Sequence, residues 1–183
     1  MDIYTKKGDH GSTSNLLGET LSKADIILQL QGDIDETNAY IGHLRATISA
    51  DHPNVIIDRS LRNCQYSLFR SGSDVATKFN KEYIQTSDIE KLEKSIDEMT
   101  SKAGELKNFI YYNGTISATM CQVIRSVVRR SERTFVTVLQ YLEWEGDFPI
   151  GYQYVNRLSD YFFTLARYFN FMQGVNDDIM KLV

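Results

Sequence analysis

The chain has 183 residues, of which 42% are hydrophobic and 24% are charged, and its formal net charge at pH 7 is −4. This composition is typical of a single soluble globular domain, and the negative charge argues against general nucleic-acid binding, because phosphate backbones recruit basic surfaces. No apolar run is long enough to span a membrane and no signal-like segment opens the sequence. We therefore expect a cytoplasmic protein that binds neither nucleic acid nor a membrane.

Residues 1–22 are rich in Gly, Ser and Thr, a composition that favours turns, and we expect this segment to be irregular and flexible. Its backbone N–H groups, hydroxyls and two lysines are suitable for wrapping a phosphate chain. It is not a Walker A loop, because the GxxxxGK[ST] spacing is absent. From these residues alone, a flexible tail is the favoured interpretation.

Three helices are predicted in the first half of the remaining chain. Apolar residues recur at spacings of three, four and seven over about 23–49 and 54–78, which places them on one stripe of a helix. A shorter helix then follows a capping box formed by Ser87 and Glu90. Residues 101–114 form a second irregular stretch.

Two long helices complete the pattern, over about 115–144 and 151–172. The first has an apolar stripe made of Met120, Val123, Val127, Thr134 and Val138. Only two prolines occur, and no run of residues alternates as a strand would. The sequence therefore predicts an all-α bundle that forms one domain over residues 1–183.

Two cysteines, Cys64 and Cys121, lie inside these helical patterns. We interpret them as small buried hydrophobes rather than as a disulfide. No CxxC pair exists, so the usual zinc and redox motifs are excluded and we expect no metal held by protein ligands.

Two rows of polar residues lie opposite the apolar stripes of the last two helices. At 100° per residue, each row shares one face of its helix; the rows are Arg125, Arg129 and Glu132, and Asn156, Asp160, Phe163 and Arg167. Each row alone is best explained as a solvated outer face with ordinary ion pairs. However, Phe163 gains nothing from solvent, and the segment VVRRSER is cationic enough to hold a triphosphate. If both faces are functional, a neighbouring subunit is the simplest surface for them to meet.

The first helix contains the acidic segment GDIDETN. Asp35 borders the apolar stripe of this helix, so a partly buried carboxylate there is possible. Such a carboxylate needs an Arg partner.

Five segments, in this order, resemble the PduO-type ATP:cob(I)alamin adenosyltransferases. The N-terminal stretch Tyr4–Thr13 matches Y-T-x-x-G-D-x-G-x-T, and Lys23 matches a lysine shortly after it. The other three matches are G-x-x-D-E-x-N-x-x-x-G over 32–42, R-x-x-x-R-R-x-E-R over 125–133 and N-R-L-S-D-x-x-F over 156–163. The resemblance covers the chain to about residue 170.

The resemblance implies a five-helix bundle with a ferritin-like up-down arrangement, assembled as a homotrimer with active sites between adjacent subunits. It implies attack of the cob(I)alamin cobalt on C5′ of ATP, which forms adenosylcobalamin and releases triphosphate. Mg²⁺ would accompany ATP, and cobalamin, supplied as cob(II)alamin or cob(I)alamin, would be the second substrate. A corrinoid reductase and an adenosylcobalamin-dependent enzyme are the partners that this reaction suggests.

The resemblance also implies residue roles. The ATP-binding residues would be Thr5, Lys6, Lys7, Gly8, Thr13, Ser14, Lys23, Arg129, Arg130, Glu132, Arg133 and Asn156. The residues that promote catalysis would be Arg129, Asp35, Arg125 and Asn156, with Asp35 and Arg125 joined in an ion pair between subunits. Phe109 and Phe163 would lie against the corrin, with Asp35 close by, and keep its lower face apolar.

The chain departs from the family pattern in three places. A Leu-Pro-Gly-Gly run is replaced by Tyr111-Tyr112-Asn113-Gly114, which can alter the loop that presents Phe109. A histidine common on the arginine helix is Gln122 here, and the C-terminal tail is short.

Three other functions compete with adenosyl transfer. A ferritin-like metal oxidase needs Glu-x-x-His motifs, and none of the three histidines lies three residues after a glutamate. A non-catalytic carrier or sensor of ATP or adenosylcobalamin would keep the same ligands without turnover. A purely structural helical oligomer would have no affinity for ATP.

Overall fold

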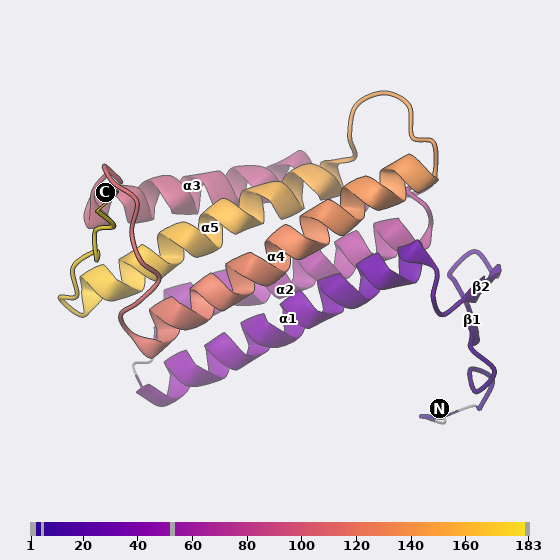
Figure 1. The fold of residues 1–183 in the computed structure, drawn as a ribbon, viewed down its shortest axis with the longest axis horizontal. Coiled ribbons are helices and arrows are strands. Elements are labelled where there is room, and N and C mark those ends of the chain that lie inside the picture. Colours follow the sequence, from indigo (N-terminus) through magenta and orange to yellow (C-terminus); the bar gives the residue numbers. More distant parts are fainter. Residues whose placement is uncertain (1–2, 5, 52–53, 182–183) are drawn as a thin grey trace.

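The computed structural model describes residues 3–4, 6–51 and 54–181. Within these residues it contains five helices that run side by side as a bundle, as Figure 1 shows. The helices are α1 (Ile26–Asp51), α2 (Val55–Ala76), α3 (Thr86–Ala103), α4 (Ile116–Tyr141) and α5 (Ile150–Met172). The predicted helical bundle is therefore confirmed.

A short antiparallel hairpin precedes the bundle. Strand β1 (Ser12–Ser14) pairs with β2 (Thr20–Ser22), so the expectation that this whole segment is irregular is wrong. Asn15 closes the turn, because its side-chain oxygen accepts hydrogen bonds from the backbone N–H groups of Leu17 and Glu19. Strands of three residues are too short to show an alternating pattern in sequence.

The hairpin is tied to the bundle at the end of α2. The Lys78 ammonium lies 2.6 Å from the Glu19 carboxylate, and the pairing lowers the pKa of Glu19. Figure 1 shows the hairpin beside the start of α1, where it projects from the bundle.

Helix α5 packs against α3 and α4, and α1 packs against α2 and α4, so the helices are in contact in the order α3, α5, α4, α1, α2. Helix α5 supplies several of the buried aromatic side chains of the core. The largest fully buried side chains include Tyr154, Tyr161, Phe162, Phe135, Leu30, Ile41 and Leu68.

The predicted apolar stripe of α4 is confirmed at Val127 and Val138, which are buried, and is wrong at Val123. Val123 is 43% exposed, whereas Cys121, Ile124, Val128 and Phe135 are buried. Because α4 packs against two helices, its buried face is wide, and spacings of three, four and seven can be drawn through it in more than one phase.

Helix ends follow local hydrogen bonding. The Asn54 side chain caps α2 by accepting from the Ile57 N–H group at 3.0 Å. At α3, the backbone N–H of Gln85 donates to the Asp88 carboxylate at 3.0 Å. The predicted capping box of Ser87 and Glu90 is therefore wrong, since α3 begins two residues earlier than that box requires.

Both cysteines are free and buried, as expected. Burial raises the pKa of the Cys64 thiol to about 12 and that of Cys121 well above its ordinary value. Neither thiol is therefore a nucleophile at neutral pH.

Among the residues that the structure describes, no helix has the length and apolar character needed to cross a membrane.

Candidate active site on helices α4 and α5

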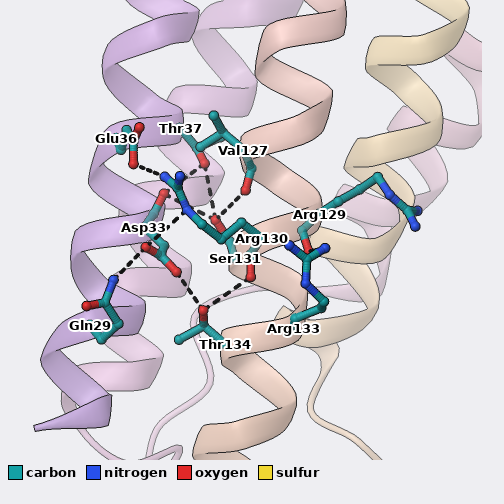
Figure 2. Close-up of polar contacts among 10 residues, drawn as sticks. All are labelled: Gln29, Asp33, Glu36, Thr37, Val127, Arg129, Arg130, Ser131, Arg133 and Thr134. Atoms are coloured by element: carbon teal, nitrogen blue, oxygen red, sulfur yellow. Dashed lines mark hydrogen bonds and ion pairs between the residues drawn. The ribbon is translucent and has the colours of Figure 1, made fainter.

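The exposed face of α4 carries a row of arginines on successive turns. Arg129 and Arg133 are both exposed, and the Arg133 guanidinium donates to the backbone carbonyl of Arg129 at 2.8 Å. Figure 2 shows the Arg129 side chain extending from α4 toward α5. Over residues 6–51 and 54–181, the Arg129 side chain has no hydrogen bond or ion pair. Its donors are therefore available to a bound anion.

The predicted polar row of α5 meets the row of α4 within the same chain. The Asn156 side-chain amide donates to the Glu132 carboxylate at 3.1 Å. Because this contact joins two rigid helices, it fixes Asn156 beside the arginine row. The two rows therefore meet at this contact within one chain and do not need a second chain to do so.

Arg125 lies between two aromatic rings. Its guanidinium carbon is 5.5 Å from the ring centroids of both Tyr112 and Phe163, and one of its nitrogens donates to the Tyr112 hydroxyl at 3.2 Å. Such cation–π contacts hold the guanidinium in place and keep it next to an apolar surface. Phe163 is half-buried in this arrangement, which accounts for an aromatic residue in a polar row.

Tyr112 was missed by sequence reasoning. It lies in the segment where the chain departs from the family pattern, so no motif pointed to it.

Arg167 does not belong to the exposed row, contrary to the sequence pattern. It is 7% exposed, and its guanidinium donates to the Asp177 carboxylate and to the Gly104 carbonyl. The C-terminal segment folds back over this part of α5, which helical spacing alone does not reveal.

A buried carboxylate next to the arginine row comes from Asp33 rather than Asp35. Asp33 is 3% exposed, and it accepts from the Thr134 hydroxyl at 2.6 Å and the Gln29 amide at 2.9 Å. Arg130 lies 3.6 Å from Asp33 and also pairs with Glu36, as Figure 2 shows. Arg130 is thereby held toward α1.

Two more hydroxyls complete this junction of α1 and α4. Thr37 and Ser131 both donate to the Asp33 backbone carbonyl, at 2.8 and 3.2 Å. A hydroxyl residue four positions after an acid, in phase with the apolar stripe, is the sequence signal that could have identified Asp33.

Asp35 lies on a different face of α1. Residues two positions apart on a helix are rotated by about 200° around its axis. Asp35 therefore points away from the α4 side that Asp33 faces. It is exposed and lines a groove between α1 and α2 together with Leu16 and Phe69. Within one chain, Asp35 therefore does not contact Arg125.

Phe109 lies in the loop between α3 and α4, and its side chain is 70% exposed. A surface hollow beside it is lined by Leu106, Phe109, Ile179 and Met180, so the loop and the C-terminal segment share this surface. Figure 1 shows the two segments adjacent at one end of the bundle.

The N-terminal residues predicted to bind ATP form a separate group. Thr5 lies outside the described residues, Lys6 and Lys7 are exposed, and Thr13 and Ser14 belong to β1. Gly8 lies against the Lys23 ammonium, since a Cβ at Gly8 would be 2.8 Å from it. In the described parts of the chain, no hydrogen bond or ion pair joins this group to the α4 arginines.

No group of three or more His, Cys, Asp or Glu side chains among the described residues could hold a metal ion.

Comparisons with known proteins agree on one family. Residues 3–169 match the model of the family described as "Cobalamin adenosyltransferase". The chain is 36% identical over 179 residues to the corrinoid adenosyltransferase of Bacillus subtilis, covering 97% of this chain and 91% of the relative. It is 34% identical to a corrinoid adenosyltransferase of Mycobacterium tuberculosis, covering 92% of this chain and 88% of that protein.

The fold is similar to solved structures. A variant of the PduO-type ATP:corrinoid adenosyltransferase from Lactobacillus reuteri, complexed with cobalamin and ATP, superposes with a TM-score of 0.86 at 30% identity. The match covers 98% of this chain and 97% of that one.

Proposed function

This chain belongs to the cobalamin adenosyltransferase family, and from that premise we propose that the exposed face shared by α4 and α5 is its active site. The protein is an ATP-dependent enzyme that transfers the 5′-deoxyadenosyl group of ATP to a corrinoid. The observation that best supports this location is the Arg129 guanidinium, which has no hydrogen bond or ion pair within the described residues, on the helix that the Asn156–Glu132 contact joins to α5.

The reaction itself demands little acid–base chemistry from the protein. Reduced cobalt is the nucleophile at C5′, and the bond that breaks joins C5′ to the triphosphate oxygen. The protein must therefore hold the two substrates in line and stabilise the charge that develops on the leaving triphosphate. The buried, protonated cysteines play no part in this scheme.

The chemistry of Arg129 suits it to bind that charge. Its planar guanidinium can donate two parallel hydrogen bonds to phosphate oxygens, and Arg133 one turn away extends the cationic surface. Arg130 adds positive charge on the side of the row that faces α1, but its guanidinium also pairs with the carboxylates of Asp33 and Glu36. Glu132 holds Asn156, so that its remaining amide hydrogen can donate to the nucleotide.

The N-terminal segment would enclose the other side of ATP. Lys6, Lys7, Gly8, Thr13, Ser14 and Lys23 supply lysine charges, hydroxyls and backbone N–H groups, which suit a phosphate chain. Thr5 is part of the same proposal from sequence alone.

The corrin would lie at the loop end of the arginine row. Arg125 is one helical turn before Arg129, Phe163 faces Arg125 from α5, and Phe109 presents an exposed ring from the neighbouring loop. An apolar lower face excludes water from the cobalt and favours its reduced, nucleophilic state.

Mg²⁺ would enter with the nucleotide. Mg²⁺ commonly binds substrate phosphates and keeps several waters, so it does not need a cage of carboxylates from this chain. When bound it would neutralise part of the triphosphate charge, while Arg129 and Lys23 supply the remainder.

A homotrimer would account for Asp35 and Arg125, which lie on faces that do not meet in one chain. An arginine and a carboxylate on separate surfaces can pair across a rotational interface, where each subunit offers one half of the pair. The exposed Phe69 and Leu16 beside Asp35 provide apolar surface for the same contact.

The reaction also suggests where the enzyme works and with what. Co(I) must be supplied by a reductant, so a corrinoid reductase would act before it. The product is a cofactor, so an adenosylcobalamin-dependent enzyme would receive it. ATP is abundant in the cytoplasm, which we propose as the location.

The test is an Arg129→Ala variant assayed with ATP, Mg²⁺ and chemically reduced cobalamin, by loss of the Co(I) absorbance. We expect kcat to fall by about 10²–10³, as when a donor to transition-state charge is removed elsewhere. Arg62→Ala, an exposed arginine on α2, is the matched control and should retain full activity.

Two results would contradict the proposal. If the Arg129→Ala variant keeps the rate of the unaltered enzyme, the active site does not lie on this face. Binding of both substrates by the unaltered protein, without formation of adenosylcobalamin, would favour a carrier.

A further inference from the structure

The loop between α3 and α4 is held at both ends by buried side chains of α5. At its start, the Arg167 guanidinium donates to the Gly104 carbonyl at 2.9 Å. At its end, the Asn170 side chain donates to the Asn113 carbonyl and accepts from the Thr115 N–H group, each at 3.0 Å. Neither Arg167 nor Asn170 reaches the polar face of α4 and α5, so the proposed chemistry leaves both unexplained.

The middle of the loop is held by the C-terminal segment, which runs alongside it. The Tyr111 N–H group donates to the Asp178 carbonyl, and the Met180 N–H group donates to the Phe109 carbonyl, each at 2.8 Å. These two hydrogen bonds flank a single antiparallel bridge. The backbone on both sides of Ile110, beginning at the carbonyl of Phe109, is thus paired with the tail.

The tail is in turn anchored by Arg167. Two nitrogens of its guanidinium donate to one Asp177 carboxylate oxygen, at 3.0 and 2.8 Å, and the Arg167 side chain is 8% exposed. A second link joins the Asn113 amide to the Asp178 carboxylate at 2.9 Å. One buried guanidinium therefore ties the start of the loop and the tail to the same turn of α5.

We propose that Arg167 and Asp177 form a positioning clamp, which fixes the tail beside the loop and thereby sets the place of Phe109 against the corrin. The inference rests on the proposed function, in which Phe109 contacts the corrinoid. The Phe109 ring is mostly exposed and receives little packing from its own chain, so its backbone is what orients it. A loop free to move would have to be ordered on binding, at the expense of corrinoid affinity.

The clamp requires arginine in particular. A guanidinium offers donors in several directions at once, so Arg167 can bind the Gly104 carbonyl and the Asp177 carboxylate together. A lysine carries a single ammonium on a flexible stem and cannot reproduce this geometry.

The first experiment removes one ladder hydrogen bond and leaves the buried charges in place. Met180→Pro deletes the N–H group that donates to Phe109. We expect the Michaelis constant for the corrinoid to rise by about fivefold, the factor expected from ordering one side chain on binding. The Michaelis constant for ATP should not change, and the Tyr111 amide should exchange with deuterium faster.

The matched control is Lys181→Pro, which places the same ring one residue further along. The Lys181 N–H group makes no backbone hydrogen bond within the described residues. Both Michaelis constants and the exchange of the Tyr111 amide should therefore stay as in the unaltered enzyme.

The second experiment tests the anchor itself. Arg167→Lys and Asp177→Asn should both speed exchange of the Tyr111 and Met180 amides and raise the corrinoid Michaelis constant, with the midpoint of thermal unfolding checked in each. Faster exchange with an unchanged corrinoid constant would overturn the proposal, because the clamp would then be structural only. Unchanged exchange in all variants would overturn it as well.

A separate variant distinguishes failure of the clamp from failure of the proposed site. If Phe109→Ala leaves the corrinoid Michaelis constant unchanged, the placement of the corrin is wrong, whatever the exchange measurements show. If Phe109→Ala raises it and Met180→Pro does not, the placement stands and the clamp is refuted.

Discussion

The junction between α1 and α4 depends on single side chains at Asp33 and Thr134. The buried Asp33 carboxylate accepts a 2.6 Å hydrogen bond from the Thr134 hydroxyl and a longer one from Gln29. Such bonds to a charged group are roughly twice as strong as neutral ones. Arg130 also forms an ion pair with Asp33. Asp33 therefore links the stability of the bundle to the position of the arginine row.

Replacement of Thr134 by Val should therefore cost stability. Val keeps the β-branched shape but cannot donate, so Asp33 loses its shortest bond, and we expect the unfolding free energy to fall by about 1.5–3 kcal/mol. Urea denaturation measures the change.

Thr137→Val is the matched control for this change. Among the described residues, the Thr137 hydroxyl donates only to the Arg133 carbonyl on the same exposed helix surface, so the effect should be within about 0.5 kcal/mol. Equal effects of the two substitutions would show that the Asp33 bond contributes nothing.

The start of α3 carries the clearest pH dependence at the scale of a secondary-structure element. Desolvation raises the pKa of Asp88, but the Gln85 N–H group and the positive charge of Arg70 outweigh it and leave the pKa below its ordinary value of 3.8. The unfolded chain then binds this proton more readily than the folded one. The stabilisation is therefore present above the ordinary pKa and is lost as pH falls through the lowered one.

Asp88→Asn should remove this contribution. At neutral pH the variant should be less stable than the unaltered protein, and the difference should shrink as pH falls below the ordinary pKa of the carboxyl. Urea denaturation at a series of pH values measures it. A difference that is constant over the whole series would mean that the carboxylate charge is not responsible.

The loop that carries Phe109 ends at Gly114, which no other residue can replace easily. Its φ of +109° is in the left-handed region, and a Cβ would occupy the space of the Asn170 amide. Gly146 has a φ of +90°, but a Cβ added there would meet nothing within 4 Å among the described residues, so it isolates the backbone effect. Gly146→Ala should cost about 1–2 kcal/mol.

Gly114→Ala should cost more than this and should also raise the Michaelis constant for the corrinoid. Urea denaturation and steady-state assays measure the two effects. Equal destabilisation at both glycines, with corrinoid binding unaffected, would mean that contact with Asn170 does not matter.

The sequence was sufficient for the position of each helix, because long apolar periodicity and few prolines leave little choice. It did not exclude Val123 from the buried face of α4, since a helix that is buried on two sides has several plausible apolar stripes. The two strands could not be predicted, because three residues are too few to show the alternating pattern of a strand. Arg167 was misplaced because its burial depends on the tail, whose contacts helical spacing does not reveal.

The candidate site was predictable where the residues lie in motifs. Arg129, Glu132 and Asn156 come together on one surface, as two helical rows on neighbouring helices can. The contact of Arg125 with Tyr112 and Phe163 was not predictable, because it depends on how the loop folds back over α4. The role of Asp33 was also missed, because an acid inside a helix is usually solvated.

At the scale of the whole molecule, the proposed pairing of Asp35 with Arg125 requires a second chain. One subunit joins the arginine row to Phe163, but it leaves Asp35 on another surface, beside the groove of α1 and α2. The proposed trimer would bring the two surfaces together and would complete each active site with residues from two subunits. Sedimentation of the purified enzyme should accordingly give three times the mass of one chain.

The most direct test of this shared site mixes two inactive variants, Asp35→Ala and Arg125→Ala, in one oligomer purified through two different tags. If each site takes Asp35 from one subunit and Arg125 from its neighbour, about one third of the sites in every mixed trimer contain both native residues. We predict that adenosyl transfer returns to about that fraction of the unaltered rate. Mixed oligomers that stay as inactive as their parents would contradict a site built between subunits.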